Sequence, residues 1–197
     1  MLYVETLPLG AYQTNCYLAW GEGSDDCIVI DPGYDPEIVL DKASALGKTV
    51  CAVLLTHGHF DHVGGVRGIA EKTNCPVYIH EKDLSQPEEM TAGPLYYTHT
   101  YGEGDMLSLA GLSVRVLHTP GHTQGSVCLL CEDTMFSGDT LFMGSMGRVD
   151  FPGGSWNQMM ASLDRLKTLP GDYRVYPGHG PATRLSEERQ FNPYMNR

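Results

Sequence analysis

The sequence predicts one layered α/β domain that takes up the whole chain, residues 1–197. Short apolar runs, most of them closed by glycine, proline or aspartate, are typical of strands, and amphipathic helical patterns fall between several of them. The chain shows no repeats, low-complexity tracts or linker-like stretches, and its length suits a single domain. Alternating strands and helices in one domain indicate an α/β fold.

Eight strands and three helices are predicted along the chain. The predicted strands cover 15–20, 27–31, 49–56, 76–80, 112–118, 126–131, 134–139 and 173–179. The predicted helices cover 36–46, 63–72 and 156–166. The third helix is the clearest, because Met159, Met160 and Leu163 share one face and Ser155 precedes it as an N-cap.

The segment 86–104 differs from the rest of the chain. It is rich in proline, glycine, threonine and tyrosine and shows little periodicity, so an irregular excursion is predicted there. Loops of that length in a compact domain often serve as lids or binding loops. A plain surface loop is an equally good interpretation of the same residues.

The charge balance is strongly acidic, with 13 Lys and Arg against 24 Asp and Glu and a formal net charge of −11. No basic cluster offsets this charge. Such a surface repels phosphate backbones and anionic membranes, so neither nucleic acid nor a membrane is an expected partner. We expect a small-molecule substrate, and the sequence indicates no particular oligomeric state.

The N-terminal segment has no basic leader followed by a long apolar stretch, and no run elsewhere is long enough to span a bilayer. We therefore expect a cytoplasmic protein. The six cysteines are scattered through apolar or turn segments. Cys128 and Cys131 form a CxxC sequence, but residues three apart in a strand point to opposite faces, which favours free core thiols over a redox or zinc pair.

The most informative residues stand at the end of the predicted strand 49–56. Four potential metal ligands, His57, His59, Asp61 and His62, occur within six residues. Packing gives no reason to place three imidazoles and a carboxylate after an apolar strand, whereas a metal ion needs such a cluster. A lone histidine would be interpreted as a core or surface residue, but four ligand-type residues together favour a metal site.

Three further strand ends repeat this arrangement, each beside a glycine. They carry His122, Asp139 and His179. Because α/β proteins build their sites at the carboxyl edge of a sheet, we expect these residues to converge with the first cluster. Asp31, in VIDPG, belongs to the same edge, where an orienting contact to a ligand imidazole and a plain Asp-Pro-Gly turn are equally good interpretations.

The remaining three histidines, His80, His99 and His118, lie outside these motifs. They are expected to be surface or hydrogen-bonded residues rather than ligands. His99 is the most interesting of them, because it lies in the excursion 86–104.

The motifs HxHxDH, PGH, GD and PGHG, in this order and at these separations, resemble those of the metallo-β-lactamase superfamily from about Thr56 to His179. The resemblance implies an αββα sandwich of two mixed β-sheets flanked by helices, with the site between the upper edges of the sheets. It also implies two metal ions. His57, His59 and His122 would bind the first ion, Asp61, His62 and His179 the second, and Asp139 would bridge them.

Such a site gives each ion four protein contacts, and a bridging hydroxide supplies a fifth. Histidine and carboxylate ligands accept zinc, iron or manganese, of which zinc is expected. Asp61 is expected to act in catalysis together with the metal-bridging hydroxide.

Within the superfamily, the chain resembles glyoxalase II and the shorter glyoxalase II-like hydrolases through QTNCYL, VIDPG, THGHFDHVGG, TPGHTQGS, SGDTLF and ERQFNPY. This resemblance implies hydrolysis of a small hydroxyacyl thioester such as S-lactoylglutathione, by attack of the hydroxide on the carbonyl carbon. The leaving group favours a thioester over an amide as the substrate. A thiol of pKa about 8.5 departs unaided, whereas an amide nitrogen needs a proton donor.

The segment 147–151, GRVDF, departs from glyoxalase II, which has a Lys and a Tyr there to grip the thiol ligand. Arg148 is expected to replace that Lys as a bidentate anchor for a substrate carboxylate, with a surface pair to Asp150 as the alternative. The same segment resembles the persulfide dioxygenases, which bind one iron and consume O2, and lactonases share the metal ligands. Gly180 and Pro181 after the last motif fit the short glyoxalase II-like branch better.

Overall fold

The computed structural model describes residues 1–196, whose strands form two six-stranded sheets and one two-stranded sheet. The first sheet contains β1 (Leu2–Leu9), β2 (Thr14–Gly21), β3 (Asp26–Ile30), β4 (Thr49–Leu54), β5 (Val77–His80) and β6 (His99–Tyr101), in this order. The second runs in the order β14 (Thr183–Arg184), β13 (Arg174–Pro177), β10 (Thr134–Gly138), β9 (Val127–Cys131), β8 (Leu112–His118) and β7 (Met106–Leu109). A short hairpin joins β11 (Leu141–Phe142) to β12 (Ser145–Met146).

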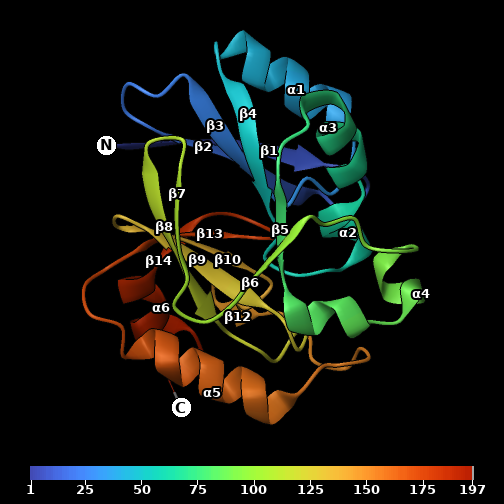
Figure 1. Cartoon of the computed structure of the whole chain (residues 1–197). Coiled ribbons are helices and arrows are strands. Elements are labelled where there is room, and N and C mark those ends of the chain that lie inside the picture. The colour runs from blue at the N-terminus through green and yellow to red at the C-terminus, as the bar shows by residue number, and fades with distance from the viewer. Residues whose placement is uncertain (197) are drawn as a thin grey trace.

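Helices cover the outer faces of the two sheets, on opposite sides of the molecule (Figure 1). The helices are α1 (Pro36–Ala45), α2 (Phe60–Val63), α3 (Val66–Thr73), α4 (Glu88–Thr91), α5 (Trp156–Lys167) and α6 (Leu185–Phe191), with a 3-10 turn η1 (Glu81–Ser85). α1 and α3 pack on the first sheet, and α5 and α6 pack on the second. Both sheets contain parallel and antiparallel pairs, so the fold is the αββα sandwich that the resemblance implied.

Side-chain alternation along the strands divides the core into three apolar layers. In β9, Val127 and Leu129 point between the two sheets, while Cys128 and Leu130 pack toward α5. Cys131 lies in the layer between the sheets, on the opposite face from Cys128, and both are free thiols, as predicted. The inner layer holds the two sheets together below the edge that carries the ligand residues.

The predicted helix 63–72 corresponds to α3, which begins three residues later, at Val66. A separate one-turn helix, α2, precedes it across Gly64 and Gly65. The turn after β3 comes too close for a continuous helix with side chains. A Cβ on Gly64 would lie 2.2 Å from the carbonyl oxygen of Gly33, and the Gly65 amide donates to the Pro32 carbonyl at 2.8 Å. This break fixes where α2 ends, directly after His62.

Several other elements could not be predicted from the sequence, among them β7 and the short strands β11, β12 and β14. The segment 86–104 is not irregular throughout, because it contains α4 and the strand β6, which pairs in parallel with β5. β1 and α6 were not predicted either. β1 is an edge strand with much of its surface exposed, so its apolar pattern is weak. Within residues 1–196, every helix is too short or too polar to cross a bilayer.

Candidate metal centre

Ligand-type side chains stand directly after four strands, all at the same edge of the sandwich. β4 leads into the segment 57–62, β8 into the loop with His122, β10 into Asp139 and β13 into His179. The first segment belongs to one sheet and the other three belong to its partner sheet. The candidate site therefore lies between the two sheets, at the position that the family resemblance implies.

Three groups of three residues are close enough to share an ion, and two of them consist of predicted ligands. The third is Asp31, His57 and His62. The ligand atoms of His57, His59 and His122 lie within 4.8 Å of one another, and so do those of Asp61, His62 and His179. In the first trio, His59 Nδ1 is 2.8 Å from His122 Nε2. In the second, His179 Nε2 is 3.2 Å from Asp61 Oδ2.

Asp139 lies between the two trios. Its Oδ1 is 3.4 Å from His62 Nε2, and its Oδ2 is 3.5 Å from His122 Nε2 and 3.6 Å from His179 Nε2. A single carboxylate thus faces imidazoles of both groups. This placement fits the bridging role that the family resemblance implies for Asp139.

Hydrogen bonds on the far side of two imidazoles fix which ring nitrogen faces the centre. His62 Nδ1 is 3.0 Å from Asp31 Oδ2, and His122 Nδ1 is 2.7 Å from the Arg148 carbonyl oxygen. A carboxylate and a carbonyl only accept, so both Nδ1 atoms carry the proton. In each ring, Nε2 is then the nitrogen that faces the site.

Asp31, in the VIDPG segment, orients the ligand-type His62. Of the two interpretations of this segment, the orienting contact is therefore the one that the structure supports over a plain turn. Its Oδ1 accepts from the Thr56 amide at 2.8 Å, and its Oδ2 accepts from the Thr56 hydroxyl at 2.6 Å as well as from His62. Its backbone lies in the left-handed region, with φ +50°. Because both oxygens are already used, Asp31 acts on the centre through its partners: through His62, and through Thr56, whose hydroxyl lies 3.1 Å from His57 Nδ1.

The donor set fits metal ions. Four buried atoms at this site have no hydrogen-bond partner among residues 1–196: His57 Nε2, His59 Nε2, His62 Nε2 and Asp139 Oδ1. An unpaired buried polar atom costs free energy, so four at one place need an explanation. Coordination of a cation would satisfy them, since imidazole nitrogens and carboxylate oxygens are ligands for zinc, iron and manganese.

The electrostatics of the site favour the ligand forms of His57, His59 and Asp139. Burial and the neighbouring imidazoles hold the pKa of His57 well below its usual range, and the same causes lower the pKa of His59 to about 3. Both rings are therefore neutral at pH 7, the form that binds metals. Burial raises the pKa of Asp139, but His62 and His122 lower it further, so Asp139 is ionised.

A cavity of about 560 Å³ opens onto the site and includes five of the seven predicted ligand residues in its lining. Its other wall is largely apolar. The apolar and aromatic lining consists of Tyr12, Phe60, Phe142, Met146 and Phe151. Such a cavity is large enough for a small substrate.

Arg148 lines this cavity, but its guanidinium is engaged. Nε and Nη2 of Arg148 each donate to Asp150 at 2.7 Å, and the guanidinium carbon lies 3.7 Å from the Phe151 ring centroid. The surface pair that was the alternative interpretation is therefore present. Both partners are more than half exposed, so the pair contributes little stability and can be exchanged.

Thr14 and Asp83 were not predicted as site residues. The Thr14 hydroxyl donates to Asp61 Oδ2 at 3.1 Å, and Thr14 lies in the QTNCYL segment quoted for the family resemblance. Asp83 accepts three hydrogen bonds from two ligand loops and stands in no recognisable motif. Thr14 could therefore have been found from the QTNCYL motif, whereas no sequence motif marks Asp83.

The other three histidines take no part in the centre. His80 and His118 stack with ring centroids 4.3 Å apart, and His99 stacks on Tyr78. Within residues 1–196, none of the three belongs to a group of ligand-type atoms that could share an ion.

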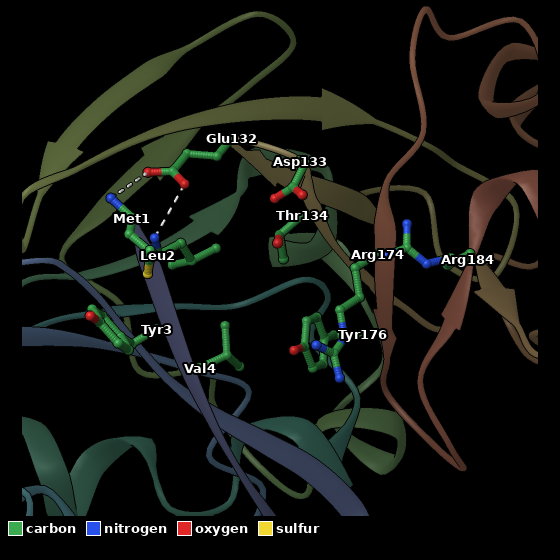
Figure 2. A pocket seen from close by; sticks show the side chains of 10 residues that line it. All are labelled: Met1, Leu2, Tyr3, Val4, Glu132, Asp133, Thr134, Arg174, Tyr176 and Arg184. Atoms are coloured by element: carbon green, nitrogen blue, oxygen red, sulfur yellow. Dashed lines mark hydrogen bonds and ion pairs between the residues drawn. The ribbon is translucent and has the colours of Figure 1, made fainter.

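A second cavity, of about 580 Å³, lies at the other end of the strands (Figure 2). It is lined by the start of β1 and by Thr134 and Arg174, the first residues of β10 and β13. Figure 2 shows Glu132 bonded to the Met1 ammonium group and the Leu2 amide. No ligand-type residue of the candidate centre lines this cavity, so the larger space is not the candidate active site.

Comparisons with known proteins agree with this geometry. Residues 9–179 match the model of the metallo-beta-lactamase superfamily. The hydroxyacylglutathione hydrolase GloC of Haemophilus influenzae is 33% identical over 209 residues, which cover 98% of each chain. The solved structure of BLEG-1 B3 metallo-beta-lactamase is 33% identical, with a TM-score of 0.90, and covers 99% of this chain and 100% of its own.

A third similar protein, TTHA1623, has been solved in a di-iron-bound form. It is 40% identical, with a TM-score of 0.86, and the match covers 96% of this chain and 99% of that one. The family model and these full-length similarities lead to the same conclusion as the ligand motifs and the sandwich. The chain belongs to the metallo-beta-lactamase superfamily.

Proposed function

We propose that this chain is a dinuclear metallohydrolase that cleaves a small hydroxyacyl thioester of the S-lactoylglutathione type. The observation that carries the proposal is the convergence of two ligand trios and a shared carboxylate at one cavity. That arrangement suits a pair of divalent ions. The similarity to GloC supports a thioester substrate, because the name of that relative states hydroxyacylglutathione hydrolysis.

The metal ions would supply a hydroxide at neutral pH and polarise the substrate carbonyl. The residues of the chain hold that chemistry in place. His57, His59 and His122 would bind the first ion, Asp61, His62 and His179 the second, and Asp139 both. Thr14 keeps Asp61 Oδ2 turned toward His179, and Asp31 keeps His62 Nε2 turned inward. The metals expected are zinc or, as in the TTHA1623 structure, iron.

The lining of the cavity favours a thiol as the leaving group. Apart from the ligand-type residues, the titratable side chains that line it, among residues 1–196, are Tyr12 and Arg148. No additional carboxylic acid or histidine stands there to protonate an amide nitrogen. A thiolate needs no such donor, because its conjugate acid has a pKa of about 8.5.

Arg148 is proposed to bind a carboxylate of the substrate, which would take the place of Asp150 as the partner of the guanidinium. The exchange costs little because the Arg148–Asp150 pair is exposed. Arg148→Met should raise KM for a carboxylate-bearing thioester several-fold with unchanged metal content, and leave a neutral N-acetylcysteamine thioester nearly unaffected. Asp150→Asn is the matched variant, and it should lower KM for the carboxylate-bearing substrate. Equal effects on both substrates would remove Arg148 from substrate recognition.

The whole proposal is tested by metal analysis of the purified chain together with a substrate panel. The panel contains S-lactoylglutathione, a neutral lactoyl thioester, a lactone, a β-lactam, and glutathione persulfide under oxygen. We expect two metal equivalents and hydrolysis of the thioesters, lost in His179→Ala and kept in the control His99→Ala.

Two results would replace this proposal by another function. One iron equivalent with oxygen consumption on the persulfide would identify an oxygenase. Hydrolysis of the β-lactam in preference to the thioesters would identify an activity like the one named for BLEG-1.

A further inference from the structure

Asp83 is a fully buried carboxylate in η1, with 0% of its surface exposed. Burial raises the pKa of this carboxyl group, and a buried carboxylate without partners would be strongly unfavourable. Its position, just before the excursion 86–104, is remote in sequence from every ligand-type residue. The proposed function assigns it no role.

Three donors surround Asp83, and they come from two different ligand loops. The Gly58 amide and the Thr123 hydroxyl donate to Oδ2 at 2.8 and 2.9 Å, and the Gly125 amide donates to Oδ1 at 2.6 Å. Gly58 stands between His57 and His59, and Thr123 directly follows His122. All three ligands of the first trio are thus next to a group that Asp83 holds.

The fit around Asp83 is close. A Cβ added to Gly125 would lie 2.6 Å from Asp83 Oδ1, so the loop can approach only because residue 125 is glycine. The Thr123 hydroxyl also forms a second hydrogen bond, to the Ser126 hydroxyl at 2.8 Å. The carboxylate therefore fixes the distance between the loop of His57 and His59 and the loop of His122.

We propose that Asp83 is a positioning residue that sets the ligand geometry of His57, His59 and His122, and so the affinity for the first metal ion. It does for the first trio what Asp31 does for His62 in the second, but through the backbone of the loops rather than through an imidazole. The inference rests on the proposed dinuclear centre. Losing a hydrogen-bond partner that orients ligands typically weakens metal binding about 10–100-fold.

The test compares Asp83→Asn with Asp31→Asn in the full-length chain. Each substitution keeps the size of the side chain but turns an amide toward a donor, so at least one hydrogen bond is lost. Zn²⁺ titration against a chromophoric chelator gives the two dissociation constants. Co²⁺-loaded protein assigns them by NMR, because the His122 Nδ1 proton reports on the first ion and the His62 Nδ1 proton on the second.

We expect Asp83→Asn to weaken the first ion at least tenfold and change the second by less than threefold, and Asp31→Asn to weaken the second ion at least tenfold. Activity of Asp83→Asn should return at high Zn²⁺, with KM near that of the unchanged chain. Thr123→Val, which removes a single donor, should weaken binding of the first ion by a smaller factor. This variant provides the same test if Asp83→Asn does not fold.

Equal weakening of both ions in Asp83→Asn, or an unchanged first ion in the folded variants, would overturn the role of Asp83. A failure of the unchanged chain to bind two ions would instead overturn the proposed function. The two failures are therefore distinguishable, and neither measurement depends on knowing the substrate.

Discussion

The ligand-type residues of the centre depend on the hydrogen-bond partners that hold them in place as well as on their own chemistry. The HxHxDH segment predicts its ligands because four donor groups in six residues have no explanation in packing. Asp83 could not be predicted in this way. Its partners Gly58 and Thr123 lie 25 and 40 positions away, and a hydrogen bond between loops leaves no local pattern in the sequence.

Asp139→Ala should abolish hydrolysis and weaken both metal ions together. Asp139 is the carboxylate that faces His62, His122 and His179, so its removal takes a ligand and a negative charge from both ions. The loss should exceed the roughly 10–100-fold effect of removing a hydrogen-bond partner of a ligand. Metal content after dialysis against a dilute chelator measures it, with Asp150→Asn as the surface control. Loss of one equivalent with the other unchanged would contradict the bridge.

At the scale of elements, the sequence predicts strands and helices better than it predicts their ends. Periodicity gave β2–β5, β8–β10 and β13, with ends that differ by a few residues, together with α1 and α5. It began α3 three residues early and missed α2, because the break between these helices depends on the approach of a distant turn to Gly64. It also missed β6, whose pairing with β5 decides its conformation more than its own composition does.

Gly178→Ala should damage the centre while leaving the fold intact. Gly178 follows β13, and a Cβ there would lie 2.1 Å from Asp139 Oδ1 and 2.7 Å from His62 Cε1. The carboxylate must move, so we expect weaker binding of both ions and a loss of about 1–3 kcal/mol in stability from overpacking. Metal titration and urea unfolding measure the two effects. Gly102→Ala, at a position with open space around it, is the matched control and should change neither metal binding nor stability appreciably.

Glu103 connects the turn after β6 to α5, and its contribution to stability should depend on pH. It accepts from the His118 amide at 2.8 Å and from Arg165 at 2.5 and 2.9 Å. Arg165 holds the pKa of Glu103 below its usual range. A lowered native pKa means that the stabilisation is present above the unfolded pKa and is lost as pH falls through the native one.

Glu103→Gln should therefore cost up to about 1 kcal/mol at pH 7, because both side chains are substantially exposed. The difference from the unchanged chain should shrink below about pH 4 as Glu103 takes up a proton. Urea unfolding at pH 7 and at pH 3.5 measures it, with Glu89→Gln as an exposed control. A cost that stays constant with pH would assign the effect to packing rather than to charge.

For the whole molecule, periodicity indicates a layered α/β protein but not how the strands divide between two sheets. The αββα arrangement was implied by the order and spacing of the ligand motifs, since only a resemblance carries information on long-range pairing. The structure shows why that order matters. Ligand residues from 57–62 approach from one sheet, and His122, Asp139 and His179 approach from the other.

The two sheets also meet near the site through contacts that need no metal. The Asn15 amide donates to the Gly178 carbonyl at 2.8 Å, and the Val127 amide donates to the Thr56 carbonyl at 2.9 Å. The Tyr17 hydroxyl donates to the Pro177 carbonyl at 2.5 Å. These contacts and the apolar layer between the sheets should hold the sandwich together when no ion is bound.

Removal of metal should therefore loosen one edge of the sandwich without unfolding it. Ions that bind only the native state stabilise it by RT ln(1 + [L]/Kd), about 4 kcal/mol at a thousandfold excess over Kd, so chelation should lower Tm. Hydrogen exchange should speed up in 57–62, 121–125 and 178–180, while the amino ends of β3 and β4 at the opposite edge keep their protection. Added Zn²⁺ should reverse both changes. A uniform rise in exchange over both sheets would show instead that the ions support the whole fold, and that the apolar layer and the metal-independent contacts between the sheets are too weak to hold it.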